Sequence, residues 1–71
     1  MHQINQEAIT HKEYSKDYIN GWEQCCDELK EINKESLRDK FNNDFPNDWI
    51  PSSLAAYYYS KGYHDRLVKE F

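Results

Sequence analysis

The chain has 71 residues, a net charge of −4 and a mean hydropathy of −1.11. A chain this short forms one domain at most, and its small core leaves a thin margin of stability. Its longest apolar run, residues 54–59, is far too short to cross a bilayer, and its first residues lack the layout of a signal peptide. We therefore expect a cytoplasmic protein that does not enter a membrane.

The pattern of apolar residues predicts an all-α chain. Residues 1–9 are mostly polar and predict a loose arm, whereas apolar residues recur at helical spacing over 10–41 and over 51–70. Both prolines lie close together, at Pro46 and Pro51, so residues 42–50 predict the connector. The expected architecture is an antiparallel helical hairpin.

The first predicted helix carries acidic residues at a regular interval of four. On a continuous helix, carboxylates with this spacing lie about 6 Å apart along the axis. The interleaved Lys30, Lys34 and Arg38 favour a solvated face with ion pairs, and the alternative is an acidic ridge that docks on a basic partner surface. The residues of this acidic ladder are Glu23, Asp27, Glu31, Glu35 and Asp39.

The only two glycines of the chain occur in similar settings. Residues 18–22 and 59–63 share the pattern Tyr-x-x-Gly-aromatic, and each segment falls inside a predicted helix. Glycine inside a helix costs about 1 kcal/mol relative to alanine, and close approach of two backbones is a physical reason to keep it. Unless the similarity of the two segments is coincidental, it predicts that the two helices cross at Gly21 and Gly62, with Trp22 and Tyr63 packed beside the crossing.

Three consecutive tyrosines occupy residues 57–59 of the second predicted helix. Neighbouring helical residues point about 100° apart, so all three side chains cannot face one core. Tyr58 and Tyr59 are expected on the polar side, either incidentally or as binding residues, because exposed tyrosine is common at interface hot spots.

The polar residues show no arrangement that indicates catalysis or metal binding. His2, His11 and His64 are isolated, and adjacent Cys25 and Cys26 suit two reduced thiols better than a disulfide. Neither a zinc-ligand spacing nor a glycine-rich phosphate loop is present. We expect no enzyme, no cofactor and no metal, and a partner chain becomes the expected source of extra stability. Pairing two hairpins into a four-helix homodimer would supply it.

Charge is unevenly distributed: residues 1–50 carry a balance of −5 and residues 51–71 a balance of +1. The chain therefore lacks the basic stripe of a nucleic-acid binder. Short, acidic, aromatic-rich and helical in pattern, it resembles short accessory proteins of bacteriophages and other mobile elements, and its seven Lys to two Arg, six Asn and six Tyr also resemble coding from an AT-rich genome. That resemblance implies an inhibitor or adaptor that binds a host protein, such as a nucleic-acid-processing enzyme. The alternative is a self-assembling structural or regulatory protein with no foreign partner.

Overall fold

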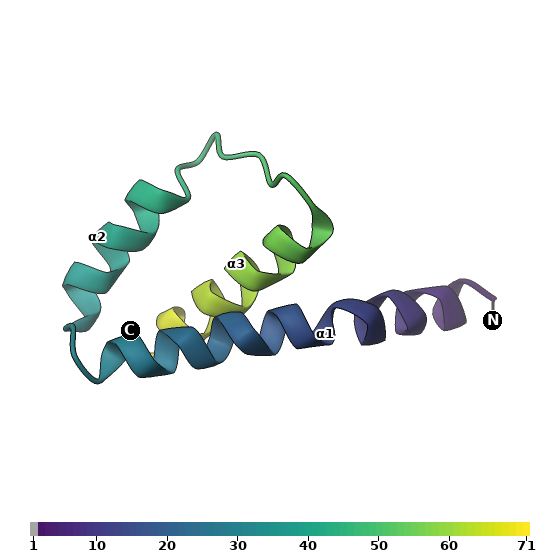
Figure 1. Ribbon diagram of the computed structural model, residues 1–71, viewed down its shortest axis with the longest axis horizontal. Helices are drawn as coiled ribbons and strands as arrows, with labels where there is room; N and C mark the ends of the chain where they lie inside the picture. Colours follow the sequence, from purple (N-terminus) through teal and green to yellow (C-terminus); the bar gives the residue numbers. More distant parts are fainter. Residues whose placement is uncertain (1) are drawn as a thin grey trace.

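The protein is all-helical in a computed structural model, which describes the backbone of residues 2–71 and the side chains of residues 14–71. Three helices follow one another: α1 (His2–Leu29), α2 (Lys34–Asp44) and α3 (Leu54–Val68). No strand occurs among the described residues. Figure 1 shows α1 and α3 packed together, with α2 leading away from the end of α1 and a connector returning to the start of α3. The predicted all-α class is confirmed.

The single helix predicted over 10–41 is wrong, because the chain turns between α1 and α2. The last turn of α1 tightens as the Glu31 amide bonds to the Glu28 carbonyl. Asn33 then begins α2, and its side chain accepts a hydrogen bond from the Ser36 amide at 2.8 Å. Asparagine is among the best N-cap residues. A local capping signal therefore overrides the continuous apolar periodicity.

The remaining predicted boundaries also shift. α1 begins at His2, so residues 2–9 are helical and do not form the predicted loose arm; the sequence places no glycine or proline before Gly21 that would interrupt a helix. The connector runs over 45–53, not 42–50. α3 begins at Leu54 because Ser53 caps it, accepting a bond from the Ala56 amide at 3.1 Å.

The predicted antiparallel hairpin is not the observed arrangement, because α1 and α3 run in the same direction. Three contacts advance together along both helices: Tyr14 stacks on Tyr58, the Tyr18 hydroxyl donates to Asp65, and the Arg66 Nε donates to Cys26 Sγ. α2 and the connector account for this direction, since together they carry the chain from the end of α1 back to the start of α3 (Figure 1). The missed turn between α1 and α2 therefore also reversed the expected direction of α3.

The backbones of α1 and α3 touch at the two glycines. A Cβ atom built on Gly21 would overlap the carbonyl oxygen of Tyr59, and one built on Gly62 would overlap the carbonyl oxygen of Tyr18. Both glycines are buried. The two carbonyls therefore lie where a side chain would start, which places each of them over a glycine Cα–H, a weak but recurrent helix–helix contact.

The crossing of α1 and α3 has approximate twofold symmetry. A shift of 41 residues carries Tyr18 to Tyr59, Gly21 to Gly62 and Trp22 to Tyr63, and it also carries Glu28 to Lys69. The contacts follow the same exchange: the Tyr63 hydroxyl donates to Glu28, while the Lys69 ammonium lies 5.1 Å from the centre of the Trp22 ring. The two Tyr-x-x-Gly-aromatic segments thus pack as a pseudo-twofold pair of parallel helices.

A small core lies on the side of this pair that α2 covers. Its buried apolar side chains, one or two from each helix, are Cys25, Leu37, Tyr63 and Leu67. Phe41 of α2 extends the core by stacking on Tyr63, with ring centres 5.6 Å apart. From Phe41 an aromatic chain continues through Phe45 to Trp49, which packs edge-on against Phe45 at 4.7 Å. These rings hold α2 and the connector over α3.

Replacing either glycine by alanine should destabilise the fold, although alanine is the better helix former. The added methyl must displace a carbonyl of the opposing backbone, so we expect Gly21→Ala and Gly62→Ala each to lower the free energy of unfolding by about 2 kcal/mol or more. Urea denaturation followed by circular dichroism measures the change. Asn20→Ala, at an exposed neighbouring position, is the matched control and should leave stability unchanged or slightly raised. Equal stability of all three variants would show that the helices do not cross at the glycines.

Candidate functional site

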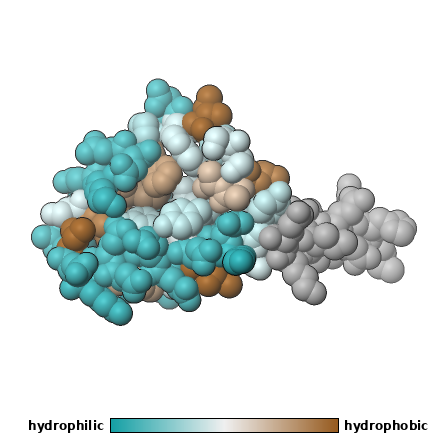
Figure 2. Space-filling model, in the orientation of Figure 1, coloured by the Kyte–Doolittle hydropathy of each residue, from teal (hydrophilic) through white to brown (hydrophobic). Residues whose placement is uncertain are grey.

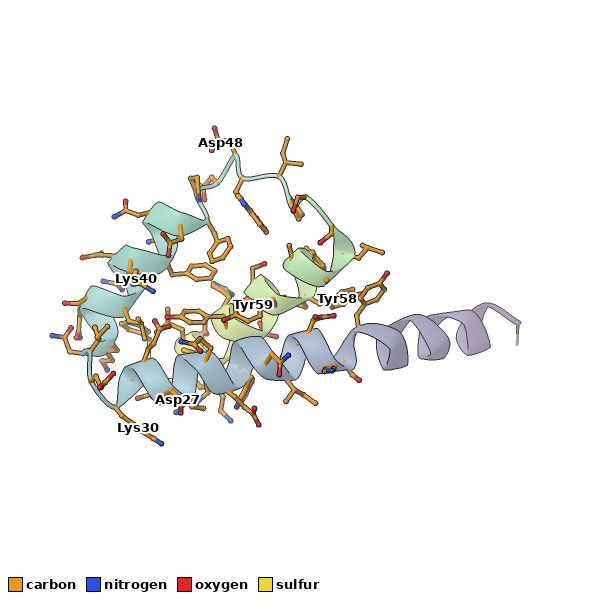
Figure 3. The ribbon with its side chains drawn as sticks, in the orientation of Figure 1. Asp27, Lys30, Lys40, Asp48, Tyr58 and Tyr59 are labelled. Carbon is orange, nitrogen blue, oxygen red and sulfur yellow. The ribbon has the colours of Figure 1, made fainter. Side chains whose placement is uncertain are left out.

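The acidic ladder does not form one straight ridge. Glu23 and Asp27 lie on α1, Glu31 lies in the turn, and the other two acids lie on α2, which leaves in a different direction. All five side chains are exposed. Asp27 is 3.8 Å from Lys30 in a well-exposed pair, which contributes little to stability, and Figure 3 shows both at the outer edge of the molecule. The other four acids make no ion pair with any residue whose side chain the structure describes.

Of the three consecutive tyrosines, the exposed one is Tyr57, whereas the prediction placed Tyr58 and Tyr59 on the surface. Tyr58 is half-buried and stacks on Tyr14 with ring centres 5.2 Å apart and planes 9° apart. Tyr59 is also half-buried, and burial raises the pKa of its hydroxyl, with the charge of Glu28 adding to the effect. Tyr57 is the exposed member of the run. Figure 3 shows Tyr58 and Tyr59 where α3 lies against α1, so both are packing residues.

Exposed apolar side chains gather instead around the start of α3. Ile50 is 84% exposed, Leu54 54% and Tyr57 42%, and all three fall within residues 50–57. Leu54 and Tyr57 are three residues apart on the helix and therefore lie on neighbouring turns of one face. Figure 2 shows hydrophobic atoms at the tip of the molecule, over the connector. We refer to Ile50, Leu54 and Tyr57 as the apical patch.

A groove of about 630 Å³ opens between α1 and α3, beside the stacked pair of tyrosines. Its lining comes from both helices: Tyr14, Ser15, Tyr18, Ile19, Tyr58, Lys61 and Asp65. Three of its polar side chains already pair with one another, because the Tyr18 hydroxyl donates to Asp65 at 2.6 Å and Lys61 lies 3.9 Å from the same carboxylate. The hydrogen bond to Asp65 and burial both raise the pKa of the Tyr18 hydroxyl. The remaining lining is mainly tyrosine rings and the half-exposed Ile19, so this tyrosine groove suits an apolar occupant.

Glu28 joins all three helices and was not recognised from the sequence. Its carboxylate accepts hydrogen bonds from Gln24 at 2.6 Å, from the Tyr63 hydroxyl at 2.7 Å and from Lys40 at 3.1 Å. Burial would raise the pKa of this carboxyl, but the three donors outweigh burial and hold the pKa below its usual value. A carboxylate kept ionised in this way is a clasp between helices and is poorly suited to act as a general acid.

A signal for Glu28 exists in the sequence. It lies seven residues after Gly21 and therefore on the same face of α1, two turns beyond the crossing. The donors that surround it come from α2 and α3, however, and only the folded chain brings Lys40 and Tyr63 to that face.

The two cysteines differ in their surroundings. Cys25 is fully buried in the core, and burial raises the pKa of its thiol to about 11. Cys26 is half-buried, and its sulfur accepts a hydrogen bond from the Arg66 Nε at 3.1 Å. Both are free thiols. Within the part of the chain whose side chains are described, no three His, Cys, Asp or Glu residues are grouped so that they could hold a metal ion.

Comparisons with known proteins add no relative. No protein-family model matches the chain, and no curated protein or solved structure matches it. Among the described residues, no helix has the length and apolar character needed to span a membrane.

Removal of one donor should weaken the Glu28 clasp. In Tyr63→Phe we expect the free energy of unfolding at pH 7 to fall by about 1–2 kcal/mol and the pKa of Glu28 to rise. Because the folded-state pKa lies below the unfolded value, this stabilisation is present at neutral pH and is lost as the pH falls through the folded-state pKa. NMR titration of the Glu28 carboxyl and denaturation at several pH values measure both effects. Tyr57→Phe, at an exposed ring, is the control; the same loss in both variants would count against the clasp.

Thiol labelling should distinguish the two cysteines. With iodoacetamide at pH 8, Cys26 should react in the folded protein, whereas Cys25 should remain protected until the chain unfolds, because it is buried and almost fully protonated. Peptide mass spectrometry of the native and urea-unfolded protein gives the two labelling rates. Fast labelling of Cys25 in the native protein would show that the core is not closed as described.

Proposed function

We propose that this protein is a small acidic protein-binding module, an inhibitor or adaptor that acts on a host protein in the cytoplasm. The observation that carries the proposal is the apical patch. A chain with a small core leaves Ile50, Leu54 and Tyr57 exposed to solvent and close together in sequence, at the end of the connector and the start of α3. Clustered exposed apolar side chains with a polar surround are typical of protein-interaction sites.

The charge of the remaining surface supports a basic partner. The chain carries −4 overall, and Glu23, Glu31, Glu35 and Asp39 are exposed and make no ion pair with any residue whose side chain is described. Unpaired carboxylates of this kind steer association with a positive surface, such as that of a nucleic-acid-processing enzyme. On this proposal the apical patch supplies contact area, and the acids supply steering.

Self-association is the second candidate, and a different surface favours it. The small core and the half-exposed Ile19 on the rim of the tyrosine groove leave α1 with an uncovered side. The predicted four-helix dimer assumed two helices per chain, so a dimer of this three-helix chain would contain six helices.

Affinity capture with patch variants tests the proposed function. Tagged wild-type protein, an Ile50→Ser/Leu54→Ser variant and a Val68→Ser control are used to capture partners from cells of the source organism, with quantitative mass spectrometry. Val68 is 53% exposed, like Leu54, but lies at the other end of α3. A specific partner should be retained by the control and lose at least about fivefold in enrichment with the patch variant. Equal enrichment with both variants would show that the apical patch is not the partner-binding site.

A charge variant examines the steering role separately. Glu31→Lys with Glu35→Lys reverses two exposed acids that make no ion pair with the described residues. We expect the association rate with the captured partner to fall and its salt dependence to weaken, while dissociation changes little. An unchanged association rate, measured by surface plasmon resonance at low salt, would remove the acids from the proposal. Tyr58 and Tyr59 are unsuitable for such tests, since both pack within the fold.

A further inference from the structure

One side of α1 combines an exposed apolar residue with two exposed ions. Lys16, Ile19 and Glu23 are spaced by three and four residues, so they occupy neighbouring turns on one side of the helix. Ile19 is 50% exposed, and Lys16 and Glu23 are exposed and make no ion pair with any described residue. We refer to these three residues as the α1 flank. It adjoins the tyrosine groove, because Ile19 also lines that groove.

The charges of the α1 flank are complementary to those of a second copy only when the two α1 helices are antiparallel. If two copies of α1 pack side by side and parallel in register, Lys16 faces Lys16 and Glu23 faces Glu23, which is repulsive. If they pack antiparallel about a twofold axis near Ile19, each Lys16 faces the partner's Glu23 on the same side of the seam. An isologous interface of this type repeats every favourable contact twice.

We propose that a second copy of this chain docks on the α1 flank, with the two α1 helices antiparallel and crossing near Ile19. The twofold axis brings the partner's Ile19 onto the tyrosine groove, whose lining includes Tyr14, Tyr18 and Tyr58. The apolar contact is therefore a side chain entering an aromatic groove, made twice, and the two Lys16–Glu23 pairs set its direction and register. The apical patch lies on the connector and α3 and is not part of this interface.

The experiment is a charge exchange measured by sedimentation equilibrium at low salt. Wild-type protein should dimerise. Lys16→Glu and Glu23→Lys alone each oppose like charges across the seam, so each should weaken the dimer by roughly tenfold. The double exchange Lys16→Glu/Glu23→Lys should restore the wild-type dissociation constant, and an equimolar mixture of the two single variants should form a heterodimer. Lys30→Glu, an exposed lysine outside the flank, is the control and should dimerise as wild type does.

The apolar contact is tested by Ile19→Asp, with Val68→Asp at equal exposure as its control. We expect Ile19→Asp to be monomeric at concentrations where Val68→Asp dimerises, with both variants keeping their helical content by circular dichroism. A wild-type protein that stays monomeric up to millimolar concentration would overturn the proposal. So would a dimer that neither Ile19→Asp nor the single charge reversals weaken. Lys16→Glu and Ile19→Asp change neither the apical patch nor the exposed acids assigned to steering, so in these two variants loss of the dimer and loss of foreign-partner capture remain distinguishable.

Discussion

The backbones of α1 and α3 touch, and this close approach positions both the core and the Glu28 clasp. Two glycines allow each helix to reach a carbonyl of the other, at Tyr59 and at Tyr18. At this separation the side chains beside the crossing interdigitate directly, so Tyr63 is buried next to Cys25 and reaches Glu28. Any larger residue at either glycine would push the helices apart and open both the core and the clasp.

The close crossing also explains why so few residues make the fold. A short chain cannot bury a large apolar area, and only four apolar side chains are buried among those that the structure describes. The backbone contact, and a carboxylate that accepts three hydrogen bonds, add to the stability that this small core provides. Glu28 is tied to each helix by a donor, including Gln24 of its own helix, Lys40 of α2 and Tyr63 of α3.

The same arrangement determines which residues remain for binding. Because α3 runs parallel to α1, Tyr58 meets Tyr14 and becomes a packing residue, while Tyr57 turns to solvent with Ile50 and Leu54. Because the chain turns at Asn33, the acids of the ladder spread over two helices and a loop instead of forming a ridge. The apical patch and the α1 flank then remain as separate surfaces, one suited to a foreign partner and the other to a second copy.

The helical class, the break around the prolines and the importance of the two glycines could be predicted from the sequence, because periodicity, proline and glycine act through local backbone geometry. The sequence also contained the cap at Asn33, but a continuous apolar stripe such as Cys25, Leu29 and Ile32 favours an unbroken helix equally well. The direction of α3, the burial of Tyr58 and Tyr59, and the donors around Glu28 could not be predicted and are seen only in the folded chain. Each of these depends on residues more than thirty positions apart or on the path of α2, and spacing along the chain carries no information about which distant residues meet.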